Sequence, residues 1–165
     1  DGAIGVKTGF TNMAGYCFVG AIKKEGKTFV SVVLGSGWPP NKSYKWSDTK
    51  MLMKYGLDNY HYRQIFETIS LEPIPVIRGR QKAVLLSLEG DLGLLLRDDE
   101  KVTIEYEIPS VINAPVIKGE QIGCAKYFVD GTLYQTIPIY TKVDVLKIDF
   151  KYCVQVISKL FFLLD

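Results

Sequence analysis

The chain begins DGAIGVKTGFTNMAGYCFVGAI (residues 1–22), and this stretch decides the fold of the segment that follows. Apolar runs at 2–8, 14–22 and 28–34 are separated by turn signals, among them Lys24-Glu25-Gly26-Lys27. Such a pattern predicts antiparallel strands, of which the last two form a hairpin. Because the runs are almost continuously apolar, they predict a sheet covered on both faces.

The hydrophobic period changes over residues 43–57, which predicts a helix that packs on this sheet. Gly56 is a plausible stop signal for it. The expected packing stripe consists of Tyr44, Met51, Leu52 and Tyr55, with Trp46 as an additional candidate.

Beyond residue 63 short strand-like pieces recur, separated by turns. Asp130-Gly131 between two alternating runs is a strong hairpin signal. The pattern predicts a small all-β sandwich or barrel. Its strands are expected at 64–70, 74–77, 82–88, 92–97, 102–107, 121–128 and 132–140.

The last unit, residues 149–165 (DFKYCVQVISKLFFLLD), predicts an amphipathic helix. Its polar residues Lys151, Gln155, Ser158 and Lys159 form one helical stripe, and most of the other residues are apolar. The apolar run is shorter than the roughly 20 residues that a membrane-spanning helix needs. An interfacial helix and a terminal helix packed on a core both fit this pattern.

Composition argues against two classes of function, nucleic-acid binding and metal binding. A length of 165 residues corresponds to one domain or two small ones, and a net charge of +2 without a dense basic block gives no support for nucleic-acid binding. Cys17, Cys124 and Cys153 form no C-x-x-C pair and His61 is the only histidine, so no metal site is expected.

The three cysteines are interpreted as buried small apolar residues. His61, between two tyrosines, is interpreted as a packing or loop residue.

Lys7-Thr8-Gly9 is a common triplet, but its surroundings make it specific. Residues 1–22 resemble the third motif region of D-Ala-D-Ala carboxypeptidases, the serine-type low-molecular-mass penicillin-binding proteins. Residues 50–56 (KMLMKYG) are similar to the closing helix of that family's penicillin-binding domain, and 113–123 (NAPVIKGEQIG) to a turn of its C-terminal β domain. The terminal amphipathic stretch stands where the family carries its membrane anchor.

The resemblance implies an α+β fold with three parts. Residues 1–62 would be the C-terminal part of a penicillin-binding, β-lactamase-like domain, made of antiparallel sheet strands and a helix. Residues 63–148 would be an all-β sandwich domain, and 149–165 a membrane-anchor helix.

The resemblance also implies site roles. Lys7 would supply positive charge to the proton network, and the backbone N–H of Phe10 would be one oxyanion donor. Gly9, without a Cβ, would let the substrate backbone lie against the strand as an added strand. The residues expected to bind substrate are Thr8, Gly9, Thr11 and Lys45. Lys45 stands where family members often place an arginine, and a solvated helix charge is the favoured alternative for it.

The nucleophile motifs S-x-x-K and S-x-N are expected upstream of Lys7, where only six residues are present. The one downstream match, Ser47-Asp48-Thr49-Lys50, is interpreted as chance. The parent enzyme would release the terminal D-Ala from peptidoglycan stem peptides without a cofactor, and β-lactams would inhibit it. This chain alone is expected to be inactive.

The implied location is the extracytoplasmic face of the bacterial cytoplasmic membrane, reached through an N-terminal signal that this chain does not contain, with residues 149–165 on the lipid. The alternative is a non-catalytic wall- or membrane-associated module that acts as spacer and anchor.

Overall fold

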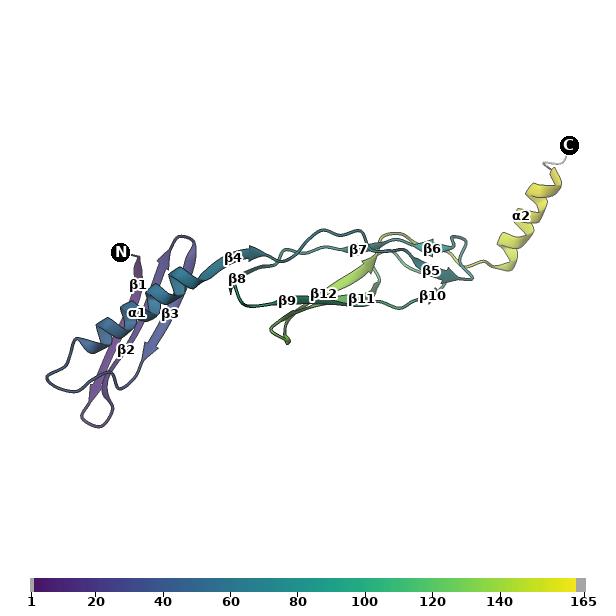
Figure 1. The fold of residues 1–165 in the computed structure, drawn as a ribbon. Helices are drawn as coiled ribbons and strands as arrows, with labels where there is room; N and C mark the ends of the chain where they lie inside the picture. Colours follow the sequence, from purple (N-terminus) through teal and green to yellow (C-terminus); the bar gives the residue numbers. More distant parts are fainter. Residues whose placement is uncertain (1, 163–165) are drawn as a thin grey trace. The chain divides into compact units, whose positions relative to one another are not determined.

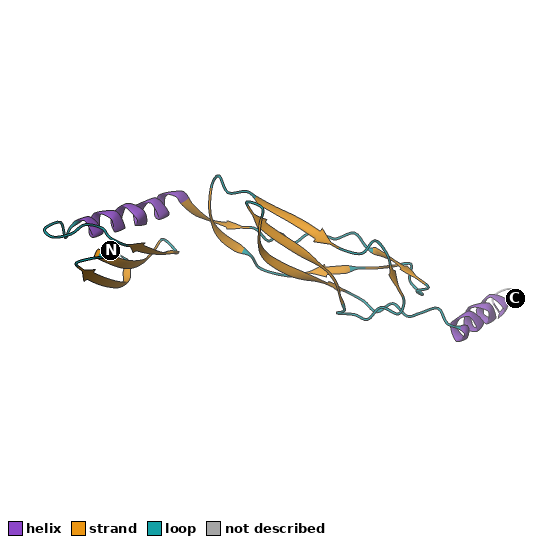
Figure 2. Ribbon diagram, turned by 90° about the horizontal axis from the view of Figure 1, so that it is seen from below, coloured by secondary structure: helices purple, strands orange, loops and turns teal. Residues whose placement is uncertain are grey.

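The computed structural model describes residues 2–162, and its contacts divide the chain into two compact units. The first unit comprises Asp1–Gln64 with Gly93–Glu100, and the second comprises Ile65–Leu92 with Lys101–Asp165. Figure 1 labels their helices and strands, and Figure 2 separates helix from strand by colour. Two helices with mainly antiparallel sheets make the fold α+β, as predicted.

The first unit contains a three-stranded antiparallel sheet in the order β1-β2-β3. The strands are β1 Ala3–Thr11, β2 Gly15–Lys24 and β3 Lys27–Val33. Glu25 and Gly26 connect β2 to β3 with φ values of 53° and 76°, the left-handed conformation that tight hairpins require. The predicted hairpin is therefore confirmed.

Helix α1, Tyr44–Asn59, packs on β2 and β3, but through a different face from the predicted one. The predicted residues Tyr44, Trp46, Met51, Leu52 and Tyr55 are all exposed. The buried positions recur every three or four residues, as one face of a helix does, but they hold small or amphipathic side chains. These buried residues are Lys45, Thr49, Met53 and Gly56.

Gly56 does not end α1, contrary to the prediction. The helix continues to Asn59, and Gly56 lies against the ring of Phe29, where an added Cβ would come within 3.0 Å of the ring carbons. Glycine at this position is explained by the close approach of the helix to β3.

Among residues 2–162 only one face of the sheet is covered, by α1, so the prediction of cover on both faces is wrong for this part of the chain. Helix α1 lies on the face that carries Phe18 and Gly20. Side chains alternate between the two faces of a strand, so the next residues along β2 and β3 face away from the helix. Among the described residues Val19, Val30 and Val32 remain exposed on that second face.

After α1 the chain enters β4, Tyr60–Gln64, which pairs antiparallel with β8, Gly93–Arg97. The strand expected at 64–70 is therefore displaced toward the N-terminus. The turn that follows β8 is held by Glu100, whose carboxylate accepts a hydrogen bond from the Arg97 backbone N–H at 2.7 Å.

The second unit is built from two sheets. One has the order β7-β12-β11-β9, with strands Leu86–Leu88, Thr132–Thr141, Gln121–Val129 and Val102–Glu107. The other has the order β10-β5-β6, with strands Ile112–Asn113, Ile74–Ile77 and Ala83–Val84. The strand predicted at 82–88 is broken at Leu85, and β10 was not predicted.

Asp130-Gly131 joins β11 to β12 with positive φ at both residues, which confirms that predicted hairpin. The core of the unit contains Val84, Ala125, Tyr127, Ile139 and Val145, all at most 1% exposed. On the surface, Lys126 donates a hydrogen bond to Glu107, which lowers the pKa of Glu107.

None of the three cysteines is buried, so the prediction of small core residues is wrong. Cys17 and Cys124 are partly exposed, and Cys153 is exposed on the terminal helix. Cys17 and Cys124 are strand residues at the sheet surface, where alternation places every second side chain outward.

The terminal helix α2, Phe150–Phe162, has no buried residue, and residues 163–165 lie outside the described part of the chain. Asp149 caps its start, because its side chain accepts a hydrogen bond from the Tyr152 N–H at 2.8 Å. No helix among the described residues meets the length and apolarity needed to cross a bilayer.

Arg80 ties the start of α2 to the β5–β6 hairpin. Its guanidinium donates to the carbonyl of Lys147 at 3.2 Å, lies 3.5 Å from the Asp149 carboxylate, and stacks 4.5 Å from the centre of the Tyr152 ring. One side chain thus contacts Lys147 before the helix, the capping residue Asp149, and Tyr152 in the first turn.

We expect Arg80→Ala to loosen this junction without unfolding the unit. A partly exposed ion pair and a cation–π contact each contribute about 0.5–1 kcal/mol, so amide hydrogen exchange at residues 149–153 should rise roughly 5- to 30-fold. Arg78→Ala is the matched control, since no side-chain interaction of Arg78 is found in the described part of the chain. Equal exchange in both variants would show that the Arg80 contacts do not hold α2.

Candidate functional site

Lys7, Thr8 and Gly9 lie inside β1. The sequence pattern had placed them at the end of a strand. The strand continues to Thr11, opposite Gly15 of β2. The turn between them is closed because the Thr11 hydroxyl accepts a hydrogen bond from the Ala14 N–H at 3.0 Å, and because Gly15 has a φ of 68°. The motif therefore has pairing residues on both sides of it.

Strand β1 is an edge of its sheet, and the backbone of Phe10 faces the open side. Tyr16, the partner of Phe10, donates its N–H to Gly37 and accepts from Ser36, both at 2.9 Å, on the side away from β1. In an antiparallel ladder the residue opposite such a residue also directs its N–H and C=O outward. Phe10, and by the two-residue period Thr8, thus direct their backbone groups to the open edge, where the Thr8 carbonyl accepts a hydrogen bond from the Lys7 ammonium.

Lys45, in the first turn of α1, reaches across to β1. Its Nζ donates to the Thr8 hydroxyl at 2.8 Å and lies 5.1 Å and 5.3 Å from the ring centres of Tyr16 and Trp46. Lys45 is only 9% exposed. The ion pairs found among residues 2–162 do not include it. A largely buried ammonium without a carboxylate is electrostatically suited to receive one.

The sheet separates the two lysines of the candidate site. Thr8 pairs with Phe18, whose ring contacts Trp46 of α1 at 4.5 Å, so Thr8 lies on the helix-covered face. Lys7, the preceding residue, projects from the other face and bends back to donate to the Thr8 carbonyl at 3.3 Å. The structure therefore brings Thr8 and Lys45 together, and keeps Lys7 apart from Lys45.

Gly9 and Thr11 differ in how the fold accounts for them. A Cβ at Gly9 would meet only the Cys17 Cβ, at 4.0 Å, so no described neighbour requires glycine there. Thr11 already has a structural partner in the Ala14 N–H.

Sequence reasoning missed Tyr16, and it left Trp46 open as either a residue that lines a peptide cleft or a packing residue. Both rings flank the Lys45 ammonium, and Trp38 also holds the site by donating its indole N–H to the Asn12 carbonyl at 2.9 Å. The adjacency of Lys45 and Trp46 was a usable signal, whereas the Tyr16 contact depends on the tertiary fold.

The other residues considered from the sequence do not belong to the site formed by β1 and α1. In the Ser47–Lys50 match, Asp48 accepts a hydrogen bond from Ser36 at 2.5 Å and Thr49 is buried under the helix. His61 is an exposed residue of β4, opposite Leu96. Within residues 2–162 no three His, Cys, Asp or Glu side chains gather as a metal site would require.

Comparison with known proteins identifies the class of the chain. Residues 60–147, more than half of the chain, match the family described as penicillin-binding protein 5, C-terminal domain. The chain belongs to this family, in which the matched region is a β-sandwich. The resemblance to D-Ala-D-Ala carboxypeptidases predicted from the sequence is thereby confirmed.

Individual proteins that resemble the chain support this family assignment. The chain is 28% identical over 153 residues to the D-alanyl-D-alanine carboxypeptidase DacF of Bacillus subtilis (strain 168). This alignment covers 90% of the chain and 39% of the relative. Among solved structures it is similar to the D-alanyl-D-alanine carboxypeptidase DacD of Francisella tularensis, with 25% identity, a TM-score of 0.58 and coverage of 90% and 37%.

Two further structures share the fold. Penicillin-binding protein 5 of Haemophilus influenzae has 26% identity, a TM-score of 0.52 and coverage of 87% and 43%. A peptidoglycan synthesis regulatory factor (PBP3) of Streptococcus pneumoniae, at 23% identity, has a TM-score of 0.56 and the same coverage. The chain thus spans about two fifths of the length of these relatives.

Proposed function

We propose that this chain is the C-terminal part of a serine-type D-Ala-D-Ala carboxypeptidase and that β1 with α1 forms the carboxylate-binding wall of its active site. The observation that carries the proposal is the 2.8 Å contact between Lys45 Nζ and the Thr8 hydroxyl at the open edge of β1. The Thr8 hydroxyl accepts a hydrogen bond from the ammonium and donates over 3.5 Å to the Cys17 carbonyl, and its proton would turn from this long contact to the terminal carboxylate of a stem peptide.

The open edge supports binding of an extended peptide. Backbone groups of Thr8 and Phe10 face away from β2, so a stem peptide ending in D-Ala-D-Ala can pair with β1 as an added strand. The open space above Gly9 lets the peptide backbone approach. The Phe10 N–H would then donate to the oxyanion that forms when the scissile carbonyl is attacked.

The chemistry requires a nucleophilic serine and its lysine, which we assign to sequence that this chain does not contain. The serine would attack the carbonyl of the penultimate D-Ala, the terminal D-Ala would leave as the amine, and water would hydrolyse the acyl-enzyme. Lys7 would stabilise negative charge and assist proton transfer. β-Lactams would acylate the same serine.

We further assign residues 1–62 to the penicillin-binding domain, 63–148 to the β domain and 149–165 to a membrane-surface anchor. Helix α2 supports the last assignment because it is apolar along most of its surface yet has no buried side chain. An amphipathic helix with this exposure suits the boundary of a lipid bilayer. The enzyme would then work on the extracytoplasmic face of the cytoplasmic membrane.

A second candidate is a non-catalytic spacer and anchor. One observation favours it: the family match covers residues 60–147 and leaves out the Lys7-Thr8-Gly9 region. Such a protein would need neither Lys7 nor the Thr8–Lys45 contact.

A chimera separates the two candidates. In it this chain replaces the matched C-terminal part of the B. subtilis DacF protein, which keeps that protein's own N-terminal part. We expect the chimera to be labelled by a fluorescent penicillin and to release D-Ala from a diacetyl-lysyl-D-Ala-D-Ala peptide. The 165-residue chain alone should not be labelled. A folded chimera without labelling would favour the spacer, and labelling of the isolated chain would contradict the assignment of the nucleophile.

Lys45 should affect recognition of the carboxylate specifically. In the chimera, Lys45→Ala should lower kcat/KM for the D-Ala-D-Ala peptide about 10- to 100-fold, the range for loss of a charge-assisted contact. The same peptide ending in an amide should be affected far less. Lys50→Ala, another α1 lysine, is the control. Equal losses on both peptides would assign Lys45 to the stability of the fold rather than to the carboxylate.

A further inference from the structure

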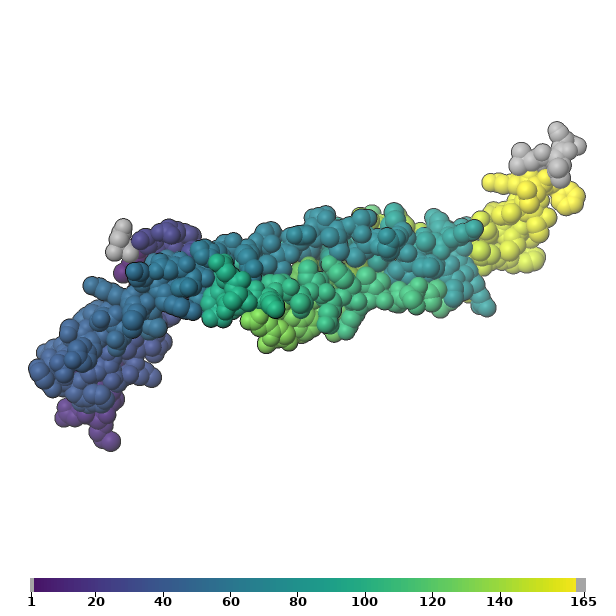
Figure 3. Space-filling model, viewed as in Figure 1, coloured from purple at the N-terminus to yellow at the C-terminus, as the bar shows by residue number. Residues whose placement is uncertain are grey.

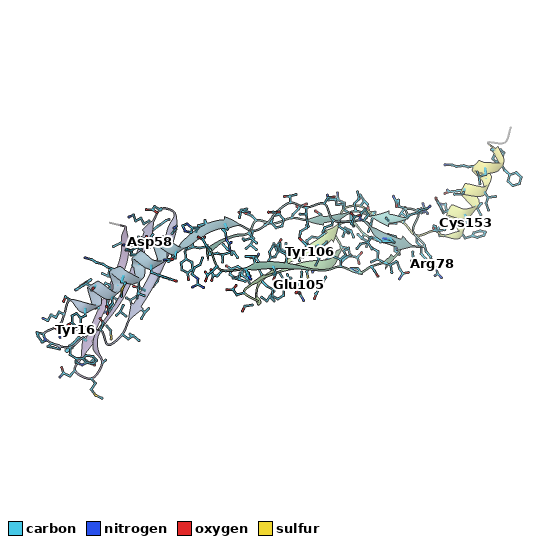
Figure 4. All side chains as sticks on the ribbon, viewed as in Figure 1. Tyr16, Asp58, Arg78, Glu105, Tyr106 and Cys153 are labelled. Carbon is cyan, nitrogen blue, oxygen red and sulfur yellow. The ribbon has the colours of Figure 1, made fainter. Side chains whose placement is uncertain are left out.

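The end of the second unit from which α2 departs carries a second group of exposed side chains. The β5–β6 hairpin tip, residues 77–82, lies beside the segment that leads into α2. Gly79 pairs with Lys147, and the Ile148 N–H donates to the Arg78 carbonyl at 2.8 Å. Figure 4 shows Arg78 at this end of the unit, near the first turn of α2. Residues distant in sequence are thus gathered at the base of the helix.

The charges at this base are predominantly positive. Arg78, Lys82 and Lys147 are exposed, and none of them forms an ion pair within the described part of the chain. The nearby carboxylate, Asp149, is already occupied by Arg80 and by the Tyr152 N–H. Helix α2 extends the basic character with Lys151 and Lys159.

Apolar side chains accompany the charges. Ile77, Leu146 and Ile148 are each at least 40% exposed. Phe150 follows directly and is 83% exposed. The space-filling view shows that side chains of α2 remain uncovered (Figure 3). Three cations next to exposed aliphatic side chains at the base of an amphipathic helix are complementary to one surface in particular, an anionic bilayer with phosphate headgroups above hydrocarbon.

We propose that these residues form a basic collar (Ile77, Arg78, Lys82, Leu146, Lys147 and Ile148) through which the β unit itself contacts anionic phospholipid. The proposal rests on the membrane contact proposed for α2, and it adds that the hairpin tip lies on the headgroups. The cations contact lipid phosphates, and the aliphatic side chains enter the boundary beneath them. The β unit is therefore a second lipid-binding element and determines lipid preference.

The test uses the complete chain and two vesicle types, pure phosphatidylcholine and phosphatidylcholine with phosphatidylglycerol. The variant Arg78→Gln with Lys147→Gln removes two exposed charges. Each basic residue near an anionic surface contributes about a fivefold change in partitioning, so removing two should lower binding to the anionic vesicles roughly 25-fold. Binding to the neutral vesicles should stay within about twofold.

The matched control is Lys54→Gln with Lys101→Gln, which makes the same change in net charge at exposed residues that are not part of the collar. It should lose much less affinity. Equal losses in the two double variants would overturn the collar and leave only a general charge effect. Loss of all vesicle binding on removal of α2, combined with equal losses in the double variants, would keep the helix anchor and reject the collar.

A depth probe distinguishes lipid from other polyanions. An environment-sensitive dye on Leu146→Cys, with the native cysteines replaced by serine, should shift to the blue on anionic vesicles, whereas the dye on Leu133→Cys should not. A collar-dependent interaction with soluble poly(glycerol phosphate), without a dye shift on vesicles, would assign the surface to a wall polymer and overturn the lipid assignment.

Discussion

Lys7→Ala in the chimera should abolish penicillin labelling on the ordinary time scale, with acylation slowed about 100- to 1,000-fold. Removing one group that stabilises developing charge in an acyl-transfer site has an effect of this size. Lys7 is exposed, and its ammonium donates a 3.3 Å hydrogen bond to the neighbouring Thr8 carbonyl, so the fold has little need of this charge. The measurement is the rate of fluorescent-penicillin incorporation.

Lys23→Ala is the control for Lys7, because Lys23 is an exposed lysine on the same face of the same sheet. It should acylate at the parental rate. An unchanged rate in Lys7→Ala would remove Lys7 from the mechanism. Circular dichroism of both variants should coincide with that of the parent, since neither side chain is buried.

Removal of residues 150–165 should remove most of the vesicle binding by the chain and leave only the weak binding of the basic collar to anionic vesicles. Ile157 and Phe161, on the apolar side of α2, are 56% and 74% exposed. Burying a large apolar side chain is worth about 1.5–3 kcal/mol when complete. At the partial depth of an interfacial helix, replacing either residue by serine should weaken binding about 5- to 30-fold. Vesicle co-sedimentation measures both effects.

Gln155→Ala, on the polar stripe of α2, serves as the control for these serine variants and should bind as the parent does. Equal sedimentation of the complete and shortened chains would eliminate the anchor. The circular dichroism signal of α2 should persist in each point variant, so that loss of binding reports lost lipid contact rather than loss of the helix.

Local pattern was enough to predict several of the strands, although not the displaced β4, the break at Leu85 or the short β10. The runs at 74–77 and 102–107 are strands with the predicted bounds, and both glycine-containing hairpins form where their turn residues indicated. These features depend on alternation and on left-handed turn geometry, which neighbouring residues determine.

The buried face of α1 could not be predicted in this way. Its apolar stripe is exposed, and the face that packs is chosen by the contours of the sheet. The helix approaches closely at Gly56 because Phe29 fills the space beneath it, and Lys45 is buried because its ammonium finds Thr8 and two aromatic rings. Tertiary contacts of this kind override local amphipathicity.

In the candidate site, too, some features could be predicted from the sequence and others depend on tertiary contacts. Lys7, Thr8 and Gly9 could be named from their triplet and its resemblance, whereas the Thr8–Lys45 contact joins residues 37 positions apart. Likewise, Arg80 meets Asp149 and Tyr152 across about 70 residues, and no sequence period links them.

The free edge of β1 has a consequence for handling the protein. A long strand with unpaired backbone groups, next to a sheet face that exposes Val30 and Val32, is a template for pairing with another copy of itself. Natural sheets protect such edges by covering them. The isolated chain should therefore be prone to concentration-dependent association and to thioflavin-positive aggregates, and Val6→Lys or Val32→Lys should raise its solubility.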